Sequence, residues 1–144
     1  KHNGEGYRNY PIDFCNTKKE IVEIFNKLFI QLFGKSGNIY HRKRANNRLR
    51  IWSFQKHSVE VAEYLKGLGF PEGVKRDILR ILPVIKTASK KEKAAFIYGV
   101  LITDGSLRSR GDILFHSGSK LFLNDLSDLI SEFVGSRFII ERKH

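Results

Sequence analysis

The chain has 144 residues, of which 41% are hydrophobic and 12% aromatic, which is enough for a compact core. Its net charge is +11, because 26 Lys and Arg face 15 Asp and Glu. A basic balance of this size favours nucleic acid as a partner over an acidic protein or a membrane surface. No apolar run approaches the roughly 18 residues of a membrane span, and the single cysteine, Cys15, cannot form an internal disulfide. We therefore expect a reduced, intracellular protein without a membrane segment.

The first elements along the chain are a short strand and an amphipathic helix. Ile12–Cys15 predicts the strand, and Lys19–Phe33 predicts a helix with its apolar residues at a period of three to four. Gly34 is expected to end this helix. Further along, Ser58 can cap a helix that ends at residue 67 or 69.

A basic β-hairpin is predicted between these two helices. Residues 38–44 and 48–54 alternate in polarity around the turn sequence "ANN". In the second strand we expect Leu49 and Ile51 to face the helices and Arg48, Arg50 and Trp52 to face solvent or a ligand. No acid lies between Glu23 and Glu60. Seven of the cations in this stretch favour contact with a phosphate backbone over an ordinary charged surface: Lys35, Arg42, Lys43, Arg44, Arg48, Arg50 and Lys56.

The second half opens with a connector and an unusual apolar helix. Residues 71–86 predict the connector, with a short helical piece bounded by Pro83. Ser89 and Glu92 form a capping box, which predicts a helix that runs through a stretch of apolar and small residues and ends at Asp104. A second hairpin, over residues 106–110 and 112–115, is expected to follow.

The chain also aligns with itself. Residues 10–34 align without gaps on residues 111–135, with matching apolar positions, a shared lysine and a shared closing glycine. After a one-residue slip, "IYHRKR" at Ile39 resembles "IIERKH" at Ile139. We therefore expect residues 1–70 to be the later part of a first repeat, 71–88 a connector and 89–144 the first part of a second repeat.

The segment "IYGVLITDG", Ile97 to Gly105, resembles the signature of the LAGLIDADG homing endonucleases. The preceding "LPVIKTASKKEKAAF" is similar to the approach to the second motif in intein- and intron-encoded members. The resemblance implies an α+β fold of two αββαββ repeats, whose antiparallel sheets form a DNA-binding saddle. It also implies that the chain lacks the first signature helix and the end of its second repeat.

The resemblance implies roles for particular residues. Ala95 and Gly99 would let two signature helices pack closely, and Asp104, with the carbonyl of Gly105, would bind Mg²⁺ for phosphodiester hydrolysis. Lys56 would be catalytic, with Gln55 and His57 as neighbours of comparable chemistry. The ordinary alternative for Asp104 is a turn acid before glycine. The hairpins would bind double-stranded DNA through Arg42, Arg44, Arg48, Arg50 and Trp52 in the first repeat, and Arg108, Arg110 and His116 in the second.

Two classes of function remain open at this point. The first is a site-specific DNA endonuclease that uses one acid from each repeat. The second acid would come from an upstream helix, from a homodimer or from a complementing fragment. The alternative is a non-cleaving nucleic-acid binder, such as an RNA maturase or regulator, or an inactive fragment. Ile102 and Thr103 replace the first Asp and the Ala of the signature, which leaves Asp104 in place.

Overall fold

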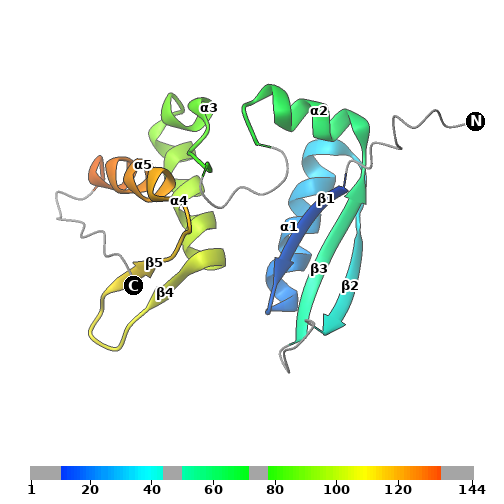
Figure 1. Cartoon of the computed structure of the whole chain (residues 1–144), viewed down its shortest axis with the longest axis horizontal. Helices are drawn as coiled ribbons and strands as arrows, with labels where there is room; N and C mark the ends of the chain where they lie inside the picture. The colour runs from blue at the N-terminus through cyan, green and yellow to red at the C-terminus, as the bar shows by residue number, and fades with distance from the viewer. Residues whose placement is uncertain (1–10, 44–49, 72–77, 134–144) are drawn as a thin grey trace, which may run out of the picture. The chain divides into compact units, whose positions relative to one another are not determined.

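A computed structural model describes residues 11–43, 50–71 and 78–133. The chain divides into two compact units, residues 1–65 and 66–144, each described here by itself (Figure 1). Both units combine helices with a small antiparallel sheet, so the α+β class is confirmed. The boundary lies close to the one expected at residue 70, although the connector belongs to the second unit.

The first unit is a three-stranded sheet with helices. Its elements are β1 (Pro11–Asn16), α1 (Lys19–Phe33), β2 (Asn38–Lys43), β3 (Arg50–His57) and α2 (Val59–Gly67). The strands are antiparallel in the order β1-β3-β2, and α1 contacts β1 and β3 (Figure 1). The predicted strand, helix and hairpin are confirmed.

The ends of both helices follow their capping residues. Gly34 ends α1 with φ of 70° and donates its N–H to Ile30 O at 2.7 Å, as a left-handed glycine cap does. Before α2, Ser58 Oγ accepts the N–H of Val61 at 3.3 Å. Gly34 therefore fixes the end of α1, and Ser58 fixes the start of α2.

Phe54 lies at the centre of this unit and is fully buried. Its ring lies 4.9 Å from the rings of Phe25 and Phe29, and Phe25 in turn stacks on Phe14 at 4.3 Å. A Cβ at position 37 would overlap the Phe54 ring, so the chain needs Gly37 there for close approach. The core therefore joins α1, both outer strands and the α1–β2 turn around one ring.

The expected orientation of the hairpin is wrong. Trp52 has the same parity in β3 as the buried Phe54, and it packs against the core cluster of the first unit. Ile51 lies on the opposite side of the strand, beside the buried Ser53. The physical reason is that Phe54 fills the core, and strand side chains alternate with a period of two, so Trp52 must follow it.

The second unit pairs helices with a two-stranded sheet. Its elements are α3 (Pro83–Lys86), α4 (Lys90–Asp104), β4 (Gly105–Leu107), β5 (Ile113–Phe115) and α5 (Lys120–Ser131) (Figure 1). Pro83 occupies the first turn of α3, where a missing N–H does no harm. The hairpin strands are shorter than predicted because residues 108–112 form the turn, in which the Arg108 N–H donates to Asp112 O and the Gly111 N–H donates to Arg108 O, and Gly111 adopts φ of +85°.

Ile81, Leu126 and Leu129 form the buried centre of the second unit. Phe115 and side chains of α3, α4 and α5 pack around them. The segment at Ile139 that resembles the one at Ile39 falls outside the described residues, as do Arg44 and Arg48. Among the described helices, none has both the length and the apolar character that crossing a membrane requires.

Candidate nucleic-acid interface and metal site

Helix α4 carries the apolar motif and has an open side. Ser89 Oγ accepts the N–H of Glu92 at 3.2 Å, so the predicted N-terminal cap of α4 is confirmed. Ala95 is exposed, Tyr98 is 63% exposed, and a Cβ at Gly99 would meet no atom within 4 Å. A helix that is apolar on most sides usually packs on more than one neighbour. Close packing of a second helix against Ala95 and Gly99 stays a prediction.

Asp104 is the last residue of α4. Its carboxylate makes no hydrogen bond or ion pair with any residue that the structure describes. Although the residue is exposed, neighbouring protein atoms partly desolvate the carboxyl group and raise its pKa above the ordinary value. The C-terminal end of a helix also carries partial negative charge, which disfavours a carboxylate there. Asp104 is thus an acid that the described residues around it do not stabilise.

Gly105 follows Asp104 directly and begins β4. Its φ is −87°, so its backbone is one that other residues also adopt. A Cβ there, however, would come within 2.6 Å of the Leu101 carbonyl oxygen. The N–H of Gly105 donates to that same carbonyl, and the residue pairs with Phe115 of β5. Glycine is therefore required by space, and this tight step from helix to strand fixes the position of Asp104.

The described residues offer only part of a magnesium site. No group of three or more His, Cys, Asp or Glu side chains in these residues is arranged to hold a metal ion. Mg²⁺ commonly binds one or two carboxylates and completes its shell with phosphate oxygens and water. The unpartnered carboxylate of Asp104 fits one such ligand, and a second acid with substrate phosphates would have to supply the rest.

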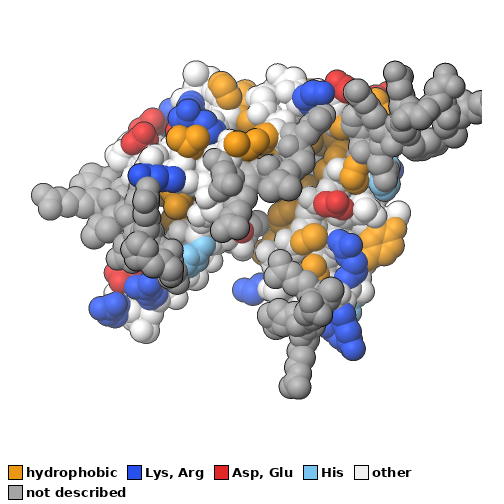
Figure 2. Space-filling model, viewed as in Figure 1, with side chains coloured by type: hydrophobic (Ala, Val, Ile, Leu, Met, Phe, Trp, Pro, Cys, Tyr) orange, Lys and Arg blue, Asp and Glu red, His pale blue; other side chains and the backbone are white. Residues whose placement is uncertain are grey.

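The outer face of the first sheet, opposite α1, is polar and hydrogen-bonding. Arg42 Nη2 donates to Ser53 Oγ at 2.6 Å, and Ser53 Oγ lies 3.1 Å from Cys15 Sγ. Arg42 Nη2 also lies 3.9 Å from Cys15 Sγ, and these contacts hold the guanidinium against the sheet, while its Nε and Nη1 donors bond to none of the described residues. Tyr40, two residues before Arg42 on the same side of β2, is 45% exposed. Figure 2 shows Lys and Arg side chains gathered toward the hairpin end of this unit.

The structure separates the predicted residues of the first hairpin. Arg50, Trp52 and Lys56 alternate on the side of β3 that faces α1, whereas Gln55 and His57 lie on the outer face with Arg42. Lys56 is half-buried and pairs in register with Ile12. It also belongs to a different unit from Asp104, so its catalytic role stays a prediction.

The predicted DNA-binding residues of the second hairpin lie around its turn and at its end. Arg108 and Arg110 are exposed in the turn, where Arg110 Nε lies 4.0 Å from Asp112 Oδ2. His116 is exposed directly after β5. Their positions leave them accessible to a ligand, and their contacts with DNA stay predictions.

The sequence reasoning missed Asp125, the most connected carboxylate of the chain's described part. It accepts hydrogen bonds from Arg80 Nη2 at 3.0 Å, Arg80 Nε at 3.2 Å, Lys86 Nζ at 3.1 Å and the Ile81 N–H at 3.2 Å. The hydrogen bonds from Arg80 hold its pKa below the ordinary value, against the opposite effect of burial. The available signal was an acid in the repeat position where the first copy has Ile24.

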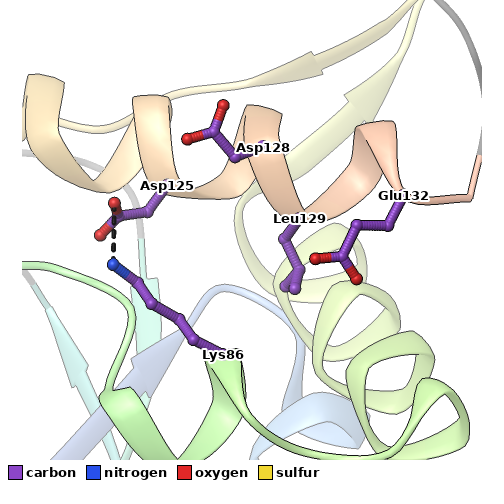
Figure 3. Close-up of a pocket in the computed structure, with 5 residues that line it drawn as sticks. All are labelled: Lys86, Asp125, Asp128, Leu129 and Glu132. Carbon is purple, nitrogen blue, oxygen red and sulfur yellow. Dashed lines mark hydrogen bonds and ion pairs between the residues drawn. The ribbon is translucent and has the colours of Figure 1, made fainter.

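Figure 3 shows the surroundings of Asp125. Lys86 reaches it from α3, while Asp128 and Leu129 follow along α5 and Glu132 lies at the C-cap of that helix. These five residues line a cavity of about 150 Å³. Glu132 is paired with Lys93 at 2.9 Å. The hydrogen bonds of Asp125 tie α3 and the segment before it to α5, so the role of Asp125 is structural.

The chain matches no protein-family model and no curated protein. What is established from the structure is the α+β class, the two units and the geometry of the groups described above.

Proposed function

We propose that this chain belongs to a site-specific homing endonuclease of the LAGLIDADG type, which cleaves double-stranded DNA by Mg²⁺-dependent phosphodiester hydrolysis. The observation that carries the proposal is Asp104, a carboxylate with no partner among the described residues, at the end of an apolar helix and held in place by the tight step at Gly105. The order of elements supports it, since α4-β4-β5-α5 matches the first four elements of an αββαββ repeat and β1-α1-β2-β3 matches the last four, with α2 following them.

In the proposed reaction, the outer face of the first sheet binds the duplex. A two-stranded antiparallel ribbon fits the major groove, and Tyr40, Arg42 and Gln55 present hydrogen-bonding groups from neighbouring strands there. Arg42 is restrained by Ser53, so less side-chain entropy is lost when it binds a base edge or a phosphate. The exposed Arg108, Arg110 and His116 would extend the contact from the second unit.

Asp104 and the Gly105 carbonyl would hold the ion. When bound, Mg²⁺ lowers the pKa of an attacking water and stabilises the leaving oxygen. The carboxylate of Asp104 would also be stabilised by the cation, which offsets the unfavourable helix end. The second acid would come from a second copy or another chain whose signature helix packs on Ala95 and Gly99. The open side of α4 supports this arrangement.

The test of cleavage uses a library of random duplexes incubated with the protein, with and without Mg²⁺. Cut ends are then sequenced to find a common site. We expect Mg²⁺-dependent cutting at one family of sites, and Asp104→Asn should abolish cutting while it retains duplex affinity. Cutting by Asp104→Asn at the wild-type rate would refute the assignment of the metal ligand.

The test of duplex binding compares two charge deletions in the first unit. Arg42→Ala removes a cation from the outer face of the sheet, and Lys27→Ala removes one from the exposed side of α1. We expect Arg42→Ala to weaken duplex binding by about 1 kcal/mol or more, roughly fivefold, and Lys27→Ala to have little effect. Equal losses in fluorescence anisotropy titrations would mean that the outer face is not the interface.

A second candidate function is a non-cleaving nucleic-acid binder. The presence of a single candidate acid on α4, with no metal-binding cluster among the described residues, favours it. Specific duplex or RNA binding without metal-dependent cutting, by a preparation in its native oligomeric state, would support this alternative.

A further inference from the structure

A group of basic and aromatic side chains occupies the side of the first sheet that faces α1. The β2–β3 register places His41 directly opposite Trp52, and Lys43 directly opposite Arg50. Lys19, the first residue of α1, lies beside them with Nζ 4.8 Å from the centroid of the Trp52 ring. We refer to these five residues as the reverse patch. Its β2 and β3 members alternate with Arg42 and Ser53, which lie on the outer face.

The aromatic part of the reverse patch is a preformed stack. The rings of His41 and Trp52 lie 4.1 Å apart, with an angle of 9° between their planes. Trp52 is half-buried and packs on the core, whereas His41 is exposed. The tryptophan therefore fixes the histidine ring in one orientation, and the exposed ring of His41 can continue the stack with a further flat ring.

Two of the three cations of the reverse patch have no acidic partner among the described residues. Lys43 and Arg50 are both exposed, and neither forms an ion pair with any residue in the described part of the chain. Like charges directly opposite one another on a sheet destabilise it, so an anion between them would relieve this repulsion. Lys19 has an acidic neighbour, Glu23 at 3.6 Å, and both of these side chains are about half exposed.

We propose that the reverse patch binds single-stranded nucleic acid. One unpaired base stacks on His41, and Lys43 and Arg50 bind the phosphates on either side of it. Aromatic platforms combined with cations are the usual means of binding single strands, because every base offers a ring face. A duplex does not offer one, since its bases are already stacked. The proposal does not depend on endonuclease activity, because the outer face and Asp104 play no part in it.

The experiment titrates the whole chain with labelled oligo(dT) and oligo(U) of about ten nucleotides, followed by anisotropy. Quenching of Trp52, the only tryptophan of the chain, gives a second readout at the patch itself. We expect His41→Ala to weaken binding about tenfold and His41→Phe to restore it, because phenylalanine keeps the ring. Lys43→Ala should reduce the slope of log affinity against log salt by about 0.7, the value for one lost phosphate contact with a single strand.

Tyr40→Ala is the matched control, because it removes an exposed ring from the other side of the same strand. It should leave single-strand affinity unchanged while duplex affinity falls. The proposal is overturned if His41→Ala binds like the wild type in a protein with an unchanged far-ultraviolet spectrum. It is also overturned if Tyr40→Ala and His41→Ala lose single-strand affinity equally. Tighter binding of oligo(U) than oligo(dT) would identify RNA as the ligand, and the reverse order would identify DNA.

Discussion

Helices α1 and α5 occupy equivalent positions in the repeated sequence, yet they bury different sides. In α1, Val22 and Phe29 are buried against the three-stranded sheet, and Leu28 is 52% exposed. In α5, the residue equivalent to Leu28 is Leu129, which is only 4% exposed in a cluster that includes residues of α4. The residue equivalent to Phe29 is Ile130, which is half-buried.

The difference shows that one apolar sequence pattern allows a helix to pack either on a sheet or on another helix. In α1 the side with Val22 and Phe29 packs on a sheet, whereas in α5 the side with Leu129 packs on residues of helix α4. Each unit uses the neighbour that it contains. Ile24, Leu28 and Leu32 consequently form an exposed row on α1. Full burial of such a side chain is worth about 1.5–3 kcal/mol, and covering the surface that is still exposed would gain the remaining part of that value. This row is suited to packing against a helix of the α4 type.

The largest expected effect comes from shortening the equivalent leucines. Leu129→Ala should destabilise the second unit by about 2–5 kcal/mol because it leaves a cavity, whereas Leu28→Ala should cost about 0.5 kcal/mol or less. Urea unfolding followed by far-ultraviolet circular dichroism reports both units, and Trp52 fluorescence reports the first one alone.

A large loss of stability in Leu28→Ala would contradict an exposed row. It would show that another segment or a second copy covers α1 in solution. A dependence of that loss on protein concentration would identify the second copy, because only association between chains responds to dilution.

The next largest effect is expected at Asp125, which occupies the repeat position of the exposed Ile24 but is buried and hydrogen-bonded. Asp125→Asn removes the charge that Arg80 and Lys86 share, and it should cost the second unit about 2 kcal/mol at neutral pH, as expected for hydrogen bonds to a charged group. Asp128→Asn, on the same helix and lining the same cavity, is the control and should change little. Trp52 fluorescence should show an unchanged first unit in both variants.

The contribution of Asp125 should depend on pH in a defined direction. Its pKa is lowered in the folded chain, so its contribution is fully present above the unfolded value of about 3.9 and is lost as pH falls through the folded value. The difference in unfolding free energy between wild type and Asp125→Asn should therefore shrink below about pH 4. A constant difference down to pH 2 would show that shape rather than charge sets the role of Asp125.

Local features of the fold were predictable because they depend on neighbours in sequence. The bounds of α1, the glycine cap at Gly34 and the serine caps at Ser58 and Ser89 follow from short-range chemistry, and the structure confirms them. The orientation of β3 was not predictable in this way. Apolar residues occur on both sides of that strand, so the sequence does not show which side faces the core. The contacts of Phe54 with the distant Phe25 and Phe29 decide it.

In the candidate site, too, features within one sequence segment were predictable and contacts between distant residues were not. Asp104 and Gly105 could be identified because their spacing lies within one segment, and the structure adds why position 105 must be glycine. The Arg42–Ser53 contact joins residues 11 apart, and the Arg80–Asp125 contact joins residues 45 apart. Neither is visible in a pattern of neighbours, and Asp125 resembles any exposed helical acid until its partners are placed.

The smallest expected effect compares Asp104 with Asp125, two acids of the second unit whose pKa values shift in opposite directions. Partial desolvation raises the pKa of Asp104, so its ionised form is less favourable in the folded chain than in the unfolded one. Asp104→Asn should therefore stabilise the second unit at neutral pH by about 0.3–1 kcal/mol, the range for removing a charge from the wrong helix end. The gain should shrink as pH falls through the raised folded value and vanish below the ordinary aspartate value of about 3.9, where both states are protonated.

Asp112→Asn is the control for this comparison, because it removes an exposed acid from the adjacent hairpin without changing the end of α4. Chemical denaturation of the three proteins at neutral pH gives the values. A stabilised Asp104→Asn means that the acid opposes folding and is retained for another purpose, as a metal ligand would be. A destabilised Asp104→Asn would mean instead that the carboxylate supports the turn into β4, and the metal-ligand role would then lose its physical basis.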